Sequence, residues 1–139
     1  MIIADTNVVS EFMRASPDPV VVEWATSVDA SELTICVVTV EEIERALGRL
    51  PDGRRRHDLE RRWSRLLQEY AESVVAYDLL AARNTAAILV AAEGDGRPMA
   101  LADAQIAGIC RAGRYELATR NVRDFSAIAG LTVINPFAG

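Results

Sequence analysis

The stretch Met1-Ile-Ile-Ala-Asp5-Thr6-Asn7 decides the fold. Its short apolar run suits a fully buried strand of a parallel sheet, and it ends abruptly in a carboxylate followed by two small polar residues. Because open α/β sheets bind ligands beyond the carboxyl ends of their strands, Asp5 is predicted to lie at an active-site edge. Thr6 and Asn7 are predicted to cap the following helix and hold Asp5 in place. Alternatively, Asp5 serves only the turn between strand and helix.

The rest of the chain alternates strand-like runs with helical patterns. Further strands are predicted at residues 33–38, 74–76, 117–119 and 131–134. Helices are predicted between them, one opening at Thr39, one following the Arg-rich segment from Arg54, and one capped by Asp78, whereas residues 120–125 are predicted to be a polar loop. This alternation predicts an α/β fold with a central, mostly parallel sheet flanked by helices on both sides. With 139 residues and no linker, residues 1–139 are expected to form a single domain.

The composition favours a compact core without a membrane span. Half of the residues are hydrophobic and the mean hydropathy is +0.10, yet no apolar run approaches the roughly 18 residues that a membrane-spanning helix needs. No signal peptide is visible, so we expect a cytoplasmic protein that does not contact membranes. Cys36 and Cys110 lack metal-ligand spacing and are predicted to be buried thiols.

The distribution of charge matters more than its sum of -5. All 15 basic residues are arginine, and eight of them fall between positions 45 and 65, against three acidic residues. Arginine suits bidentate phosphate contacts, so Arg54, Arg55 and Arg56 are candidates for contact with RNA or a protein partner. The alternative is a solvated helix face with ordinary ion pairs such as Arg56 with Glu60.

Four carboxylates could converge at one edge of the sheet: Asp5, Glu42, Asp103 and Asp124. Such groups repel one another unless a cation compensates, and oxygen ligands with few histidines select Mg²⁺ or Mn²⁺. Each carboxylate also has a purely structural explanation. Glu42 could complete a capping box with Thr39, Asp103 suits the first turn of a helix, and Asp124 could cap a short turn.

Four motifs follow one another along the chain: Asp5-Thr6-Asn7-Val8-Val9-Ser10-Glu11, Thr39-Val40-Glu41-Glu42-Ile43, Leu101-Ala102-Asp103-Ala104-Gln105-Ile106-Ala107 and Thr119-Arg120-Asn121-Val122-Arg123-Asp124-Phe125. In this order and at this spacing they resemble the PIN-domain ribonucleases. The resemblance is best to the VapC toxins of type II toxin-antitoxin systems, and among them to the FitB-like members. The segment Leu50-Pro51-Asp52-Gly53-Arg54-Arg55-Arg56 also resembles that subgroup.

The resemblance implies the PIN-domain fold and a Mg²⁺- or Mn²⁺-dependent endoribonuclease. Asp5, Glu42 and Asp103 are carried over as the acidic, metal-binding core, and Asp124 as its fourth member. Water would attack the phosphodiester in line, leaving a 5′-phosphate and a 3′-hydroxyl. The supporting positions are Thr6, Asn7, Thr119 and Asn121, the last at a position that is acidic in some relatives.

The resemblance also implies partners. These are an RNA substrate, a second copy of the chain and a VapB-like antitoxin that covers the acidic groove and can carry the pair onto DNA. Val20, Val21, Trp24 and the third and fourth helices are candidates for the homodimer surface. Two alternatives stay open: a DNA-directed nuclease of the same fold, and a catalytically inactive PIN-like module that binds or dimerises.

Overall fold

Four parallel strands form one sheet in the order β2-β1-β3-β4. The computed structural model describes residues 1–138, and its strands are β1 (Ile2–Ala4), β2 (Leu33–Thr34), β3 (Glu116–Ala118) and β4 (Val133–Ile134). The helices are α1 (Thr6–Phe12), α2 (Pro19–Ser27), the short 3₁₀ helix η1 (Ala30–Glu32), α3 (Val37–Gly48), α4 (Arg54–Tyr70), α5 (Leu79–Gly94), α6 (Leu101–Gly113) and α7 (Val122–Phe125). The predicted α/β fold is confirmed.

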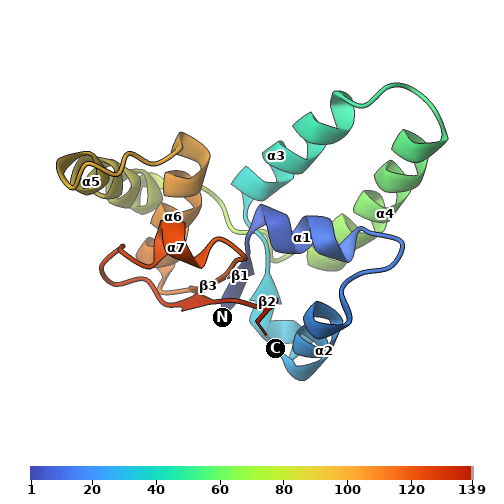
Figure 1. Ribbon diagram of the computed structural model, residues 1–139, viewed down its shortest axis with the longest axis horizontal. Helices are drawn as coiled ribbons and strands as arrows, with labels where there is room; N and C mark the ends of the chain where they lie inside the picture. Colours follow the sequence, from blue (N-terminus) through green and yellow to red (C-terminus); the bar gives the residue numbers. More distant parts are fainter. Residues whose placement is uncertain (139) are drawn as a thin grey trace.

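The core consists of two apolar clusters that meet at β1. Successive side chains of a strand point to opposite faces of the sheet. Ile3 therefore packs with α5, α6 and β3, whereas Ala4 packs with α1, α3 and α4. Figure 1 shows the same division, with α5, α6 and α7 to one side of the strands and α1 to α4 to the other. Both Cys36 and Cys110 are buried free thiols, as predicted.

Helices α5 and α6 pack closely enough that only glycine fits at position 108. A Cβ atom there would lie 2.1 Å from the hydroxyl oxygen of Thr85 and 2.8 Å from the carbonyl oxygen of Ala81. The Asp78 side chain caps α5 by accepting from the Ala81 amide at 2.9 Å, as predicted. The close packing of α5 against α6 at Gly108 fixes the position of α6, whose first turn carries Asp103.

Several predicted boundaries are wrong. Beyond β2 the chain pairs only through an isolated bridge between Cys36 and Val75, so the predicted strands 33–38 and 74–76 are largely absent. The Val37 amide donates to the Val75 carbonyl at 3.0 Å, which satisfies a free amide at a helix start. Helix α3 therefore begins at Val37 and not at Thr39. The predicted loop 120–125 contains the short helix α7.

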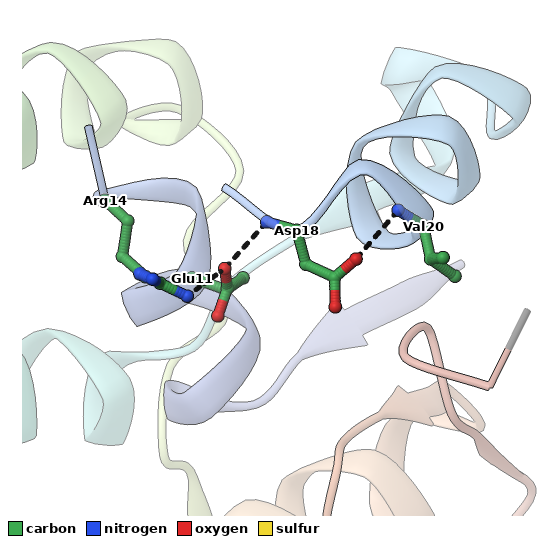
Figure 2. Close-up of polar contacts among 4 residues, drawn as sticks. All are labelled: Glu11, Arg14, Asp18 and Val20. Carbon is green, nitrogen blue, oxygen red and sulfur yellow. Dashed lines mark hydrogen bonds and ion pairs between the residues drawn. The ribbon is translucent and has the colours of Figure 1, made fainter. Parts of the chain in front are cut away.

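A buried carboxylate holds the turn between α1 and α2. Glu11 is only 5% exposed and its Oε2 accepts from the Asp18 amide at 2.8 Å and from the Arg14 guanidinium at 3.0 Å. Figure 2 shows these bonds together with the bond by which Asp18 accepts from the Val20 amide and caps α2. The cap sets the helical phase of α2 and turns Val21 into the core.

The orientation of α2 contradicts part of the predicted homodimer surface. Val21 is fully buried, and Trp24 is half-buried against the core. The large apolar side chains that are most exposed belong instead to α5 and α6: Leu79, Leu80, Val90 and Leu101. Within residues 1–138, no helix is both long and apolar enough to cross a membrane.

Candidate active site

Asp5 lies at the carboxyl end of β1 and its carboxylate accepts three hydrogen bonds. Oδ1 accepts from the Thr6 amide at 2.8 Å, and Oδ2 accepts from the Thr119 hydroxyl at 2.7 Å and from Asn7 Nδ2 at 3.1 Å. Asp5 is itself the N-cap of α1, so the prediction that Thr6 and Asn7 cap this helix is wrong. They are its first residues, but both help to hold Asp5, as predicted.

Burial and hydrogen bonding act on the Asp5 carboxyl in opposite directions. The side chain is only 3% exposed, and its burial raises its pKa. The hydrogen bonds from Thr119, Thr6 and Asn7 lower the pKa, whereas the negative charge of Glu42 raises it further. The net result is a raised pKa, so the ionised form of Asp5 is held at a cost in free energy.

Glu42 projects from the second turn of α3 and contacts the first motif directly. Its Oε1 accepts from the Thr6 hydroxyl at 2.6 Å, and the hydroxyl oxygens of Thr6 and Thr39 lie 3.2 Å apart. Thr39 is a buried residue inside α3 and not its N-cap, so the capping box between Thr39 and Glu42 is absent. Thr39 was not predicted as a site residue, since its pattern with Glu42 is the one that capping boxes share.

Asp103 brings the four carboxylates into one electrostatic group. It stands in the first turn of α6, where burial raises its pKa, and the charges of Asp5, Glu42 and Asp124 raise it further, to about 6. Charges raise a neighbouring pKa only over short distances in a folded protein. The charges of Asp5, Glu42 and Asp124 therefore all act on Asp103, whereas the roles of the four carboxylates as a catalytic and metal-binding group stay a prediction.

The fourth motif joins the end of β3 to the end of β1. The Thr119 hydroxyl, which donates to Asp5, accepts from the Asn121 amide at 3.0 Å. Asn7 Oδ1 accepts from the Arg120 amide at 3.1 Å. Asn121 contributes through its backbone, and Asp124 stands exposed in the first turn of α7. These bonds tie the end of β3 to Asp5 at the end of β1.

The structure does not bring Arg54, Arg55 and Arg56 to the carboxylates. They form the first turn of α4, at the end of the α3–α4 pair that points away from the sheet (Figure 1). Arg54 and Arg55 are exposed, whereas Arg56 donates to Glu60 at 3.0 Å and to the Leu50 carbonyl at 3.2 Å. Any contact that Arg54 and Arg55 make with a partner therefore lies outside the carboxylate group.

The donor set fits a hard divalent cation. The side-chain atoms that could coordinate a cation at this site are carboxylate, hydroxyl or amide oxygens, which Mg²⁺ and Mn²⁺ prefer. Within residues 1–138, no three His, Cys, Asp or Glu side chains form a ready-made metal cage. Mg²⁺ does not need one, because it typically binds through one or two carboxylates and keeps several waters.

Comparisons with known proteins agree with this geometry. The PIN domain family model matches residues 2–131. VapC ribonuclease Y4jK of Sinorhizobium fredii is 36% identical over 138 residues, covering 99% of this chain and 98% of that protein. Toxin FitB of Neisseria gonorrhoeae is 31% identical, with 99% of both chains covered. The structure of FitAB bound to an IR36 DNA fragment matches with a TM-score of 0.89 and 32% identity, covering 99% of this chain and 96% of that chain. With a family model that matches residues 2–131 and relatives that match nearly its whole length, the chain belongs to the PIN-domain family, among the VapC and FitB toxins.

Proposed function

We propose that this protein is the toxin of a type II toxin-antitoxin system and acts as a Mg²⁺- or Mn²⁺-dependent endoribonuclease. The observation that carries the proposal is the group of four carboxylates that includes Asp103. Burial raises the pKa of Asp103, and the charges of the other three carboxylates raise it further, to about 6. Carboxylates that repel one another in this way are typical of sites where a cation and a phosphate bind. The name of the relative Y4jK, a VapC ribonuclease, supports RNA as the substrate.

Asp5 and Asp103 would hold the cation, and Glu42 and Asp124 would contribute directly or through water. When bound, Mg²⁺ or Mn²⁺ supplies an activated water and stabilises charge on the phosphate. Thr119 and Asn7 fix the orientation of the Asp5 carboxylate through their bonds to Oδ2. Water attacks phosphorus in line, the P–O3′ bond breaks, and the products carry a 5′-phosphate and a 3′-hydroxyl.

Thr6 couples two of the carboxylates. Its backbone amide donates to Asp5 while its hydroxyl donates to Glu42. A single residue at the start of α1 thus sets the separation of two side chains from β1 and α3. We infer that Thr6 and Thr119 are positioning residues for the reaction.

The proposal extends to partners. FitAB is a two-component complex that binds DNA in its solved structure, and this chain aligns with one component over nearly its whole length. An antitoxin would therefore cover the acidic edge and carry the pair onto DNA. The exposed apolar residues of α5 and α6 are the better candidates for a homodimer surface. Residues 1–139 would act as one PIN domain.

The test is cleavage of total cellular RNA by purified protein that is free of any partner. Assays with Mg²⁺, with Mn²⁺ and with EDTA compare the wild type, Asp5→Asn and Glu23→Gln, a matched control because Glu23 is exposed on α2, away from the four carboxylates. We expect metal-dependent cutting that persists in Glu23→Gln and disappears in Asp5→Asn. Cutting of DNA alone would favour the DNA-directed nuclease. The absence of any cutting by folded protein would favour the inactive binding module.

A further inference from the structure

A cavity of about 570 Å³ opens beside two of the four carboxylates. Asp103 and Asp124 line it, together with the last turns of α5, the segment 95–100 and the residues that follow α7. Figure 1 shows α5, α6 and α7 grouped on this side of the sheet. The volume falls within the range of about 300–1,000 Å³ that is typical of small-ligand sites.

One wall of this cavity is apolar. Ile88, Met99 and Ile128 line it and belong to, or pack against, the core cluster under the sheet. A wall built on the core presents a fixed surface, which a planar nucleobase can contact through its face. Stacking of bases on aromatic side chains tolerates any base and contributes much of the affinity for single strands, and the apolar wall here offers van der Waals contact in place of an aromatic ring.

The charged residues at the cavity divide into fixed and free. Arg111 is fixed, since it donates to Asn84 Oδ1 at 2.7 Å and to the Ala129 carbonyl at 3.2 Å. Arg97 and Arg123 are exposed and, within residues 1–138, make no ion pair and no side-chain hydrogen bond. Two unengaged guanidinium groups beside a group of carboxylates are suited to bidentate contacts with phosphate.

The charged lining of the cavity comprises three carboxylates (Asp95, Asp103 and Asp124) and three arginines. Because Arg97 and Arg123 make no side-chain bonds within residues 1–138, they are the groups available to attract the phosphate of a nucleotide. The carboxylates Asp103 and Asp124 mark where the scissile phosphate would lie under the proposed function. The cavity next to them then receives the neighbouring nucleotide of the same strand.

We infer that this cavity is a nucleotide-binding subsite, in which the apolar wall receives a base and Arg97 and Arg123 bind the phosphate next to the scissile one. The inference rests on the proposed function and extends it, because it assigns substrate contacts to residues outside the four carboxylates. It places the RNA backbone along the start of α6 and α7, and not along the distant Arg54–Arg56 turn of α4.

The test measures RNA binding separately from cleavage. In the Asp5→Asn background, binding of a labelled single-stranded RNA is followed by fluorescence anisotropy at several salt concentrations. One variant carries Arg97→Gln and Arg123→Gln together, and its control is Arg83→Gln, at an exposed arginine of α5 outside the cavity. A second variant, Ala127→Trp, fills the cavity, and its control is Ala71→Trp at an exposed position after α4.

We expect the double arginine variant to bind RNA at least tenfold more weakly, with the slope of log K against log salt reduced by about 1.4 for the two lost phosphate contacts. Ala127→Trp should also bind at least tenfold more weakly, but with an unchanged salt slope. Both controls should match the parent. In the cleaving protein, the same changes should raise KM more than they lower kcat.

The outcomes separate this inference from the function on which it rests. If the wild type neither binds nor cuts RNA, the proposed function fails. If RNA is bound and cut normally by both cavity variants, only the subsite is wrong. Normal RNA binding together with lost binding of an antitoxin peptide would also overturn the subsite, and would assign the cavity to the protein partner.

Discussion

Replacing Asp103 with asparagine should stabilise the metal-free protein. The pKa of Asp103 is raised from 3.8 to about 6, first by burial and then by the charges of three neighbouring carboxylates. Because the pKa in the folded state lies above that in the unfolded chain, the ionised form opposes folding. The favourable contribution is present below pH 4 and is lost as the pH rises through 6.

The size of the effect follows from the same values. A rise from 3.8 to about 6 corresponds to at most about 3 kcal/mol. Water reaches this half-buried carboxyl and screens its charge, so about 1–2 kcal/mol is a fairer expectation. For a chain of 139 residues, that difference raises Tm by roughly 3–8 °C at pH 7.5.

The assay is thermal unfolding in EDTA between pH 4 and pH 8, with Glu23→Gln as the control. The gain from Asp103→Asn should be absent at pH 4, grow between pH 4 and pH 7, and then stay constant. Added Mg²⁺ or Mn²⁺ should raise the Tm of the wild type more than that of the variant, because ligands stabilise the state they bind. If Asp103→Asn is no more stable than the wild type at pH 7.5 in EDTA, the assumed repulsion does not exist.

Three further substitutions, with Gly94→Ala as a control for one of them, test how the site and its scaffold are held. Thr119→Val removes a hydroxyl that donates to the carboxylate at the end of β1, so it should slow RNA cleavage at least tenfold below pH 7 and cost about 1–2 kcal/mol in urea unfolding. Normal cleavage at pH 6 would count against the positioning role. Glu11→Gln should cost about 1–2 kcal/mol, because it breaks an ion pair at a side chain that is 5% exposed, and an unchanged urea midpoint would contradict this. Gly108→Ala should cost at least about 2 kcal/mol, since its Cβ would lie 2.1 Å from the Thr85 hydroxyl. At Gly94 a Cβ atom would meet nothing within 4 Å, so Gly94→Ala should leave the free energy of unfolding unchanged or increase it by up to about 1 kcal/mol. Equal effects of the two glycine substitutions would show that helix packing is not the cause.

The parts of the fold that depend on local sequence could be predicted. An apolar run ending in Asp5 identifies β1, and Asp78 correctly marks the start of α5 because capping involves only neighbouring residues. The end of β2 could not be predicted in this way. It depends on the bridge between Cys36 and Val75, which lie far apart in the sequence.

In the candidate site, too, local sequence predicts some features, and contacts between distant segments determine the others. The four carboxylates can be named from the sequence because each stands in a motif of its own, and their roles stay a prediction. The bond from Thr6 to Glu42 could not be predicted, since it joins α1 to α3. The spacing of Thr39 and Glu42 also fits a capping box, which would give Glu42 a different partner. The positions of Arg97 and Arg123 at a cavity were not foreseen either, because no spacing in the sequence relates the loop before α6 to α7.

The structure treats its two central carboxylates differently, and this difference locates the need for a cation. Asp5 accepts three hydrogen bonds that offset its burial. Asp103 accepts none from side chains or backbone within residues 1–138, although three negative charges act on it. Donors built into the fold would stabilise Asp103 permanently, but they would occupy the oxygens that a metal ion needs. Leaving Asp103 without donors costs the metal-free protein stability, and that cost becomes additional affinity when a cation binds. The proposed increase in Tm on adding Mg²⁺ and the proposed stabilisation by Asp103→Asn therefore depend on the same uncompensated charge, although the size of the first also depends on the Mg²⁺ concentration relative to its Kd. Asp103→Asn should gain stability in EDTA and lose most of the increase that Mg²⁺ produces in the wild type.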